Sequence, residues 1–189
     1  YGERAVRFIR ALRHPKSGKP FQLDYWAERM TRRIYGPCHT TGPNAGERIV
    51  RKAFAMLPRG ARKTTIGAAY ALLHSIGPER VGHGQGILAA YDRAQARIPY
   101  DEAAGIVSCD RRIQAATKVR DFRHEIVHLK SGAKLKAVSS DASAQNGKTP
   151  NFVLFDEVHA WRKRALYDVL YTGLNKSKNS LQVVISQAG

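Results

Sequence analysis

Cysteine is scarce in this chain of 189 residues, which has only Cys38 and Cys109 and no C-x-x-C pair. Disulfide-stabilised secreted folds and zinc ribbons are therefore excluded, and a reducing cytoplasm fits best. The chain also lacks an apolar run of about 18 residues, the length that a membrane-spanning helix needs. The first twelve residues carry four charged side chains and no continuous apolar stretch, unlike a signal peptide.

Acidic residues are also few, with 15 Asp and Glu against 32 Lys and Arg, a formal net charge of +17. This excess favours a polyanionic partner. Nucleic acid is favoured over an anionic membrane, because the basic residues are spread along the chain and form no amphipathic basic helix. A basic surface that is merely solvated remains the alternative.

Apolar runs alternate with helical spacings, which predicts an α/β fold with a mainly parallel sheet flanked by helices on both faces. Helices are predicted at residues 1–13, 24–35, 64–76 and 164–174, and strands within 48–57 and at 86–91, 152–155 and 181–186. A further helix begins at Asp92, and Pro99 is expected to kink or divide it. Two strands, 119–129 and 133–139, are expected to meet in a hairpin at Ser131-Gly132.

A phosphate-binding loop is predicted at residues 59–64, where a strand gives way to a helix. Backbone N–H groups and the positive helix end bind phosphate at such a junction. Lys63 would reach the β and γ phosphates of ATP, and the Thr64 hydroxyl would bind Mg²⁺. The strict G-x-x-x-x-G-K-[ST] pattern is not met, since Leu57 and Arg62 occupy its glycine positions, so the loop alone is weak evidence.

Two acids directly follow the apolar run 152–155. Asp156, at the end of a buried strand, is expected to bind Mg²⁺, and Glu157 to deprotonate the water that attacks the γ phosphate. A charged side chain beside an apolar core is costly unless an opposite charge or hydrogen bonds compensate for it. Together with the upstream Lys-Thr pair, the acids therefore predict an ATPase site.

Residues 124–128, His-Glu-Ile-Val-His, match the zinc-peptidase pattern H-E-x-x-H. That pattern binds zinc only on a helix, where both histidines share a face. The surrounding residues are typical of a strand, in which the two histidines would lie about 13 Å apart. We therefore interpret His124 and His128 as ordinary strand residues.

With these motifs in order along nearly its full length, the chain resembles the large terminase subunits of tailed phages. Residues 20–23 with Trp26 resemble the family's adenine-side segment, 58–65 its variant Walker A motif, 153–157 its Walker B motif and 185–189 its coupling motif. Residues 89–90 with 92–96, and residues 139–142 leading to Gly147, match intermediate stretches. The resemblance assigns nucleotide contacts to Phe21, Gln22, Trp26, Gly60, Ala61, Arg62, Lys63, Thr64 and Thr65.

The resemblance implies a P-loop fold of the ASCE class that hydrolyses ATP with Mg²⁺ and translocates double-stranded DNA into a procapsid in the host cytoplasm. Its implied partners are the portal protein, the small terminase subunit and further copies of this chain in a ring. Arg59 would sense the γ phosphate, and Ser186 and Gln187 would couple hydrolysis to DNA. The implied organisation is one ATPase domain over 1–189, with an adenine-side segment (1–46) and a P-loop core (47–189), without the family's nuclease domain.

Three departures from the family pattern stand out: Arg62 replaces the glycine before Lys63, Ala27 stands where Gln often follows Trp26, and Gln187 alters the coupling motif. Two alternatives stay open. One is another DNA-dependent ATPase, such as a helicase-like motor, which shares both Walker motifs. The other is a basic DNA-binding module that no longer hydrolyses ATP. The basic clusters 32–33, 111–112 and 162–164 suit phosphate contacts without sequence specificity in either case.

Overall fold

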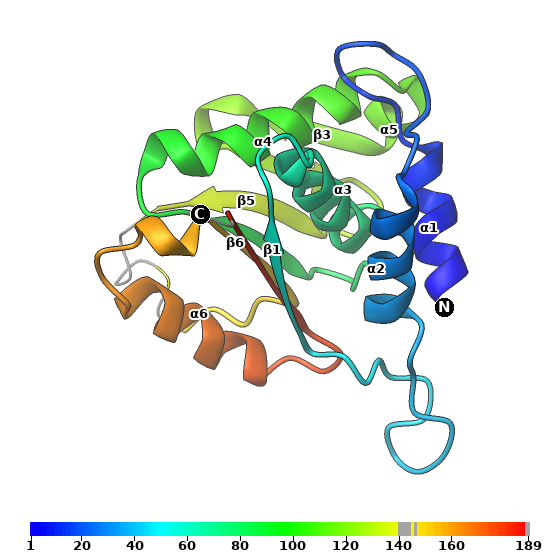
Figure 1. Ribbon diagram of the computed structural model, residues 1–189, viewed down its shortest axis with the longest axis vertical. Coiled ribbons are helices and arrows are strands. Elements are labelled where there is room, and N and C mark those ends of the chain that lie inside the picture. The colour runs from blue at the N-terminus through cyan, green and yellow to red at the C-terminus, as the bar shows by residue number, and fades with distance from the viewer. Residues whose placement is uncertain (140–144, 146, 188–189) are drawn as a thin grey trace.

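A seven-stranded sheet in the order β1-β7-β6-β2-β5-β4-β3 organises the chain (Figure 1). The computed structural model describes residues 1–139, 145 and 147–187. The strands are β1 (Lys52–Leu57), β2 (Gln85–Ala89), β3 (Thr117–Arg120), β4 (Glu125–His128), β5 (Lys134–Val138), β6 (Phe152–Asp156) and β7 (Leu181–Gln187). The strands from β1 to β5 in this order are parallel, whereas β4 and β3 are antiparallel to their neighbours. The predicted mainly parallel α/β sheet is confirmed.

Helices cover both faces of this sheet. They are α1 (Gly2–Ala11), α2 (Tyr25–Tyr35), α3 (Lys63–Ser75), α4 (Arg93–Ser108), α5 (Arg111–Ala116) and α6 (Ala165–Asn175). The first five pack on one face, whereas α6 lies on the other (Figure 1). Among the described helices, none is both long and apolar enough to span a bilayer.

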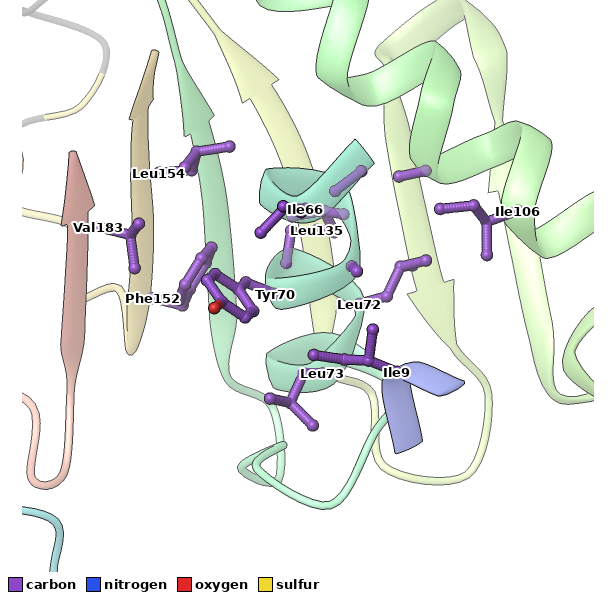
Figure 2. Close-up of a cluster of buried hydrophobic side chains, with 14 of the residues drawn as sticks. Ile9, Ile66, Tyr70, Leu72, Leu73, Ile106, Leu135, Phe152, Leu154 and Val183 are labelled. Carbon is purple, nitrogen blue, oxygen red and sulfur yellow. The ribbon is translucent and has the colours of Figure 1, made fainter. Parts of the chain in front are cut away.

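Helix α3 lies at the centre of the larger core. Its Tyr70, Leu72 and Leu73 are fully buried between the sheet and α1, α2 and α4 (Figure 2). Burial of such side chains contributes about 1.5–3 kcal/mol each. Gly67 allows α3 to approach β6 closely, since a Cβ there would lie 2.8 Å from Leu154 Cδ2. This packing fixes the start of α3 relative to the end of β6.

Strand β6 is buried on both faces, as its uninterrupted apolar sequence predicts. Leu154 belongs to the core beneath α3, whereas Val153 and Phe155 belong to a second core with Leu166 and Leu170 of α6. The helix α6 therefore secures the strand that carries the two acids from the opposite side.

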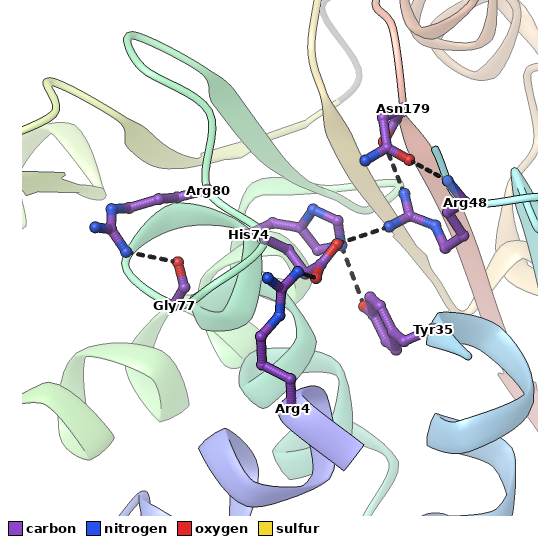
Figure 3. Close-up of polar contacts among 8 residues, drawn as sticks. Arg4, Tyr35, Arg48, His74, Gly77, Arg80 and Asn179 are labelled. Atoms are coloured by element: carbon purple, nitrogen blue, oxygen red, sulfur yellow. Dashed lines mark hydrogen bonds and ion pairs between the residues drawn. The ribbon is translucent and has the colours of Figure 1, made fainter. Parts of the chain in front are cut away.

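A buried polar network closes the end of α3 opposite Lys63 (Figure 3). The Arg48 side chain, 2% exposed, pairs with Glu79 at 3.0 Å and donates to the Asn179 carbonyl at 2.7 Å. Tyr35 Oη lies 3.2 Å from His74 Nε2. Burial lowers the pKa of His74 well below its usual value, so this imidazole is neutral. The network connects α2, α3 and the loop before β7. It lies away from the predicted site.

Most predicted elements are present within about two residues of their predicted ends, including the hairpin that joins β4 to β5. The strand predicted within 48–57 is shorter than that range, because Arg48 turns inward to its ion pair and β1 begins at Lys52. The short helix α5 was not predicted. Its signal is Asp110, whose carboxylate accepts a hydrogen bond from the Arg112 backbone N–H at 2.9 Å.

Local structure differs from prediction at two places. Of the two effects expected of Pro99, division of the helix does not occur, because α4 continues from Arg93 to Ser108 with Pro99 buried in its packed face. The strand predicted at 119–129 is two strands, β3 and β4, separated by a 3₁₀ turn. Asp121 in this turn accepts a hydrogen bond from Tyr100 Oη of α4, and His124 ends it with a left-handed φ of 45°. These tertiary contacts override the strand propensity of the segment.

Candidate active site

The predicted motifs meet at one edge of the sheet, at the carboxyl ends of its parallel strands. Residue pairs Leu57–Gln187 and Asp156–Ile185 align the ends of β1, β6 and β7. The loop after β1 leads directly into Lys63, the first residue of α3. In open α/β sheets this edge is where ligands bind.

Lys63 and Glu157 are in direct contact across this edge. Lys63 Nζ donates to Glu157 Oε1 at 3.0 Å, although the residues are 94 positions apart in sequence. Their side chains are 12% and 25% exposed, respectively. The loop lysine and the acid that directly follows β6 therefore meet at this edge of the sheet.

The loop before α3 has the shape of an anion-binding turn. Gly60 has a φ of 83° and Arg62 has a left-handed conformation with φ 52° and ψ 37°. No described side chain caps the first turn of α3. Its leading backbone N–H groups can therefore donate to phosphate oxygens. Arg62 adopts the conformation that favours the glycine of the strict motif.

Glu157 also has a left-handed backbone, with a φ of 49°. Its N–H donates to the Ile185 carbonyl at 3.0 Å, and Trp161 Nε1 donates to the Asp156 carbonyl at 2.9 Å. The 3₁₀ turn η3 (Val158–Ala160) follows directly. Strain of this kind persists only where surrounding contacts impose it, and it clusters at functional sites. Here it turns the Glu157 carboxylate out of the strand toward Lys63.

Asp156 is a half-buried carboxylate at the end of β6. Burial, followed by the neighbouring charge of Glu157, raises its pKa to about 6, although Lys63 acts in the opposite direction. Mg²⁺ prefers oxygen ligands of this kind. The Asp156 carboxylate and the Thr64 hydroxyl at the start of α3 are thus the residues that could hold the ion.

A cavity of about 380 Å³ lies beside the phosphate loop. Phe21 and Gln22 line it from one side, and Ala61, Arg62 and Thr65 from the other. The lining also includes Lys16 and Lys19, on a loop closed by pairing of Arg13 with Pro20. The structure therefore brings together most of the residues predicted for nucleotide binding.

Trp26 lies apart from these residues. It lines a second cavity, of about 540 Å³, with Phe54 of β1 and Tyr70 of α3, whereas its neighbour Ala27 lines the first. The one-residue step along α2 places the two side chains on different faces of the helix. The expected contact of Trp26 with the nucleotide is therefore not supported by its position.

The remaining predicted residues have mixed surroundings. Arg59 is exposed at the tip of the phosphate loop. Thr65 donates its hydroxyl hydrogen bond to Glu102 Oε1 of α4 at 2.7 Å. Ser186 is buried on β7, and its Oγ lies 3.0 Å from His159 Nδ1. Ala188 and Gly189 of the expected coupling motif lie outside the described residues, as do residues 140–142 of the second intermediate stretch.

Sequence reasoning missed Glu102 and His159. Glu102 lies 37 positions from Thr65 and belongs to no local motif. His159 lies 3.2 Å from Glu157 Oε2 and also contacts Ser186. Its spacing after the two acids is visible in the sequence, but its partner on β7 is not.

Other residues singled out in the sequence lie away from this edge or are already paired. His124 is in the turn before β4 and His128 is in that strand, so the H-E-x-x-H segment forms no helix. In each of three basic clusters, one arginine is held by a carboxylate of this chain. These arginines are Arg32, Arg112 and Arg164.

The chain is similar to terminase large subunits of bacteriophages. The family model "Terminase large subunit, ATPase domain" matches residues 31–189. The terminase large subunit of Enterobacteria phage HK97 is 26% identical over 192 residues, covering 98% of this chain and 36% of that protein. The chain thus spans little more than a third of that relative.

Solved structures show the same fold. The crystal structure of the HK97 bacteriophage large terminase superposes with a TM-score of 0.85 at 25% identity, over 98% of this chain and 37% of that one. The large terminase ATPase domain of Thermus phage P74-26 gives a TM-score of 0.57 at 21% identity, over 72% of this chain and 59% of that one. The predicted P-loop NTPase-like fold is confirmed by these likenesses.

Proposed function

Because the chain belongs to the family of terminase large subunit ATPase domains, we propose that it hydrolyses ATP with Mg²⁺ and uses this reaction to drive double-stranded DNA into a procapsid. The observation that carries the proposal is the contact of Lys63 with Glu157, 3.0 Å, beside Asp156 at the carboxyl edge of the sheet. A cation for phosphate, a carboxylate for the metal and a base for water are the groups that phosphoryl transfer needs.

The proposed mechanism gives each of these groups one role. The backbone N–H groups that begin α3 and the Lys63 ammonium would hold the phosphate chain, and Asp156 with Thr64 would hold Mg²⁺. Mg²⁺ supplies charge neutralisation at the phosphate oxygens. Lys63 moves from Glu157 to phosphate, and the released carboxylate then orients water and takes its proton.

The base and ribose of the nucleotide are assigned to the cavity of about 380 Å³ beside Phe21 and Gln22. Its size is in the range typical of ligand pockets. Lys16 and Lys19 on the rim add positive charge near the phosphates. Arg59, at the exposed tip of the loop, is assigned to the γ phosphate.

DNA is proposed as the polyanion that the net charge of +17 attracts. Ser186 and Gln187, at the end of β7, sense the loss of the γ phosphate and transmit it to the surface that binds DNA. We further propose that the chain acts as one ATPase domain in a ring of copies on the portal, with the small terminase subunit, in the host cytoplasm. These partners are those of the family that the chain resembles.

Steady-state phosphate release, measured with and without double-stranded DNA at low salt, tests the proposal. Wild-type chain should release phosphate in a Mg²⁺-dependent reaction, and DNA should accelerate it. Glu157→Gln is the matched inactive control because it keeps the side-chain size. Calorimetry with ATP gives binding independently of turnover.

The outcomes separate the alternatives. ATP binding without hydrolysis in any condition, together with salt-dependent DNA binding, would indicate a basic DNA-binding module. Strand displacement on forked DNA would indicate a helicase-like motor. Packaging of DNA in the presence of portal and procapsid distinguishes the packaging motor from both.

A further inference from the structure

His159 stands between the predicted base and the coupling strand. Its Nδ1 lies 3.2 Å from Glu157 Oε2 and 3.0 Å from Ser186 Oγ. The imidazole is 53% exposed at the side-chain level, so burial does not account for its orientation. One nitrogen atom thus lies within hydrogen-bond distance of groups on two different strand ends.

The chemistry of these groups decides which tautomer is compatible with the site. An ionised Glu157 carboxylate can only accept hydrogen bonds, whereas a serine hydroxyl can donate or accept. An unprotonated Nδ1 would place its lone pair 3.2 Å from the negatively charged Glu157 Oε2, which repels it. Protonation at Nδ1 removes this repulsion and gives both oxygens the same donor. Glu157 and Ser186 therefore compete for a single N–H.

The two acceptors have different surroundings. Glu157 Oε1 is held by Lys63, whereas Ser186 is buried in β7 and paired in register with Met56 of β1. The next pair along these strands, Leu57 and Gln187, directly precedes the phosphate loop. A change at the loop that shifts β7 would therefore reach the His159 side chain through Ser186.

We propose that His159 is a positioning residue that holds Glu157 in place for water activation and ties it to β7 through Ser186. Glu157 contacts both Lys63 and His159. When Lys63 turns to phosphate, Glu157 loses the contact with Lys63 and keeps the one with His159. The N–H of His159 then shifts from Ser186 to Glu157 and fixes the carboxylate. The inference rests on the proposed ATPase function, and it adds a residue that joins the base to the coupling strand.

The test compares His159→Ala and His159→Asn in steady-state ATP hydrolysis. His159→Ala should lower kcat roughly 10–100-fold, the scale on which outer hydrogen-bond partners act, with KM nearly unchanged. Asn carries an N–H donor near the position of Nδ1, so His159→Asn should recover a substantial part of kcat. His39→Ala, at an exposed histidine on the loop after α2, is the matched control and should behave like wild type.

A double-mutant cycle tests the link to β7. If the same N–H serves both groups, the effects of His159→Ala and Ser186→Ala on kcat should be strongly non-additive. Independent, multiplicative effects would overturn the link. An unchanged kcat in His159→Ala, or an equal loss in His159→Asn, would overturn the positioning role.

Nitrogen-15 NMR of the imidazole provides a readout that does not depend on turnover. The Nδ1–H tautomer is expected in wild-type chain, and an Nε2–H tautomer would overturn the proposal. A wild-type chain without ATPase activity but with the Nδ1–H tautomer would refute the proposed function and leave this contact intact. The two failures are thus distinguishable.

Discussion

The ammonium group of Lys63 lies 3.0 Å from the Glu157 carboxylate, so the residue assigned to phosphate binding and the residue assigned to base catalysis neutralise each other. Both side chains are mostly shielded from water, and the attraction is therefore stronger than at an exposed pair. A triphosphate at the loop must compete with Glu157 for Lys63. The affinity for ATP and the release of Glu157 to act as the catalytic base therefore depend on the same contact.

Glu157→Gln should abolish turnover while leaving ATP binding equal to or tighter than that of wild type. The neutral amide cannot take a proton, which should reduce kcat by at least about 10²-fold, and it competes less well for Lys63. Calorimetry with ATP and a phosphate-release assay measure the two effects separately. Wild-type-like turnover in this variant would remove Glu157 from the role of base.

Lys63→Ala should weaken ATP binding by about 10–100-fold, because charge-assisted hydrogen bonds to phosphate contribute about 1.5–3 kcal/mol. Calorimetry checks this directly. Lys52→Ala is a suitable control, since Lys52 is an exposed lysine of β1 that contacts Tyr171 on the far side of the sheet from α3. Equal affinities in wild type and Lys63→Ala would contradict the phosphate assignment.

Asp156 should make the stability of the chain fall as pH rises. Its pKa in the folded chain, about 6, is above its ordinary value of 3.8. Between these values the folded chain holds a proton that the unfolded chain has released, so the free energy of unfolding decreases with increasing pH. The loss is about 3 kcal/mol, since each pKa unit corresponds to about 1.4 kcal/mol, and it is complete above the folded pKa.

Asp156→Asn should remove this decline, because its side chain does not ionise, and should leave the variant more stable than wild type near pH 8. Urea denaturation from pH 4 to 8 measures both chains, with Asp101→Asn on the exposed face of α4 as control. Addition of Mg²⁺ and ATP should stabilise wild type above pH 6 but not Asp156→Asn. If the free energy of unfolding of the two chains changed with pH in the same way, the raised pKa of Asp156 would be contradicted.

Much of this site could be predicted because local sequence patterns mark the strands of the sheet and the helix that follows β1. The run from Phe152 to Phe155 predicts a strand buried on both faces, and the acids after it must then lie at the sheet edge. The start of α3 follows equally from local pattern. Parallel strands bring such ends together, and the meeting of Lys63 with Glu157 could be inferred without coordinates.

What could not be predicted depends on backbone conformation or on distant contacts. The left-handed φ angles of Arg62 and Glu157 are imposed by surroundings and contradict residue preference. His159 meets Ser186 across 27 positions, at a distance that periodicity does not report. Trp26 and Ala27 are adjacent in sequence, yet only Ala27 lines the cavity beside the loop.

Arg62→Gly should be more stable than Arg62→Ala by about 1 kcal/mol, since a left-handed φ of 52° costs that much for a residue with a Cβ. Arg62→Gly should also bind ATP more tightly than wild type, because it removes a side chain where the backbone approaches phosphate. Urea denaturation and calorimetry check the two effects. Equal stability of the two variants would show that the loop relaxes out of this conformation.

Arg48→Met should destabilise the chain by about 3–5 kcal/mol, because it removes the buried cation that pairs with the Glu79 carboxylate. Arg4 also contacts Glu79, at 2.5 Å, but is itself 48% exposed and cannot replace the buried guanidinium. Arg97→Met is the matched control. It breaks the exposed pair with Asp101 and should cost less than about 1 kcal/mol.

The double variant Arg48→Met with Glu79→Leu should regain part of the lost stability, since no charge then remains unpaired in the interior. Urea denaturation of the four chains gives the coupling energy. Because this network lies at the end of α3 opposite Lys63, ATP affinity in native conditions should be unchanged in all of them. A change in ATP affinity without a change in stability would mean that α3 transmits the state of this network to the phosphate loop.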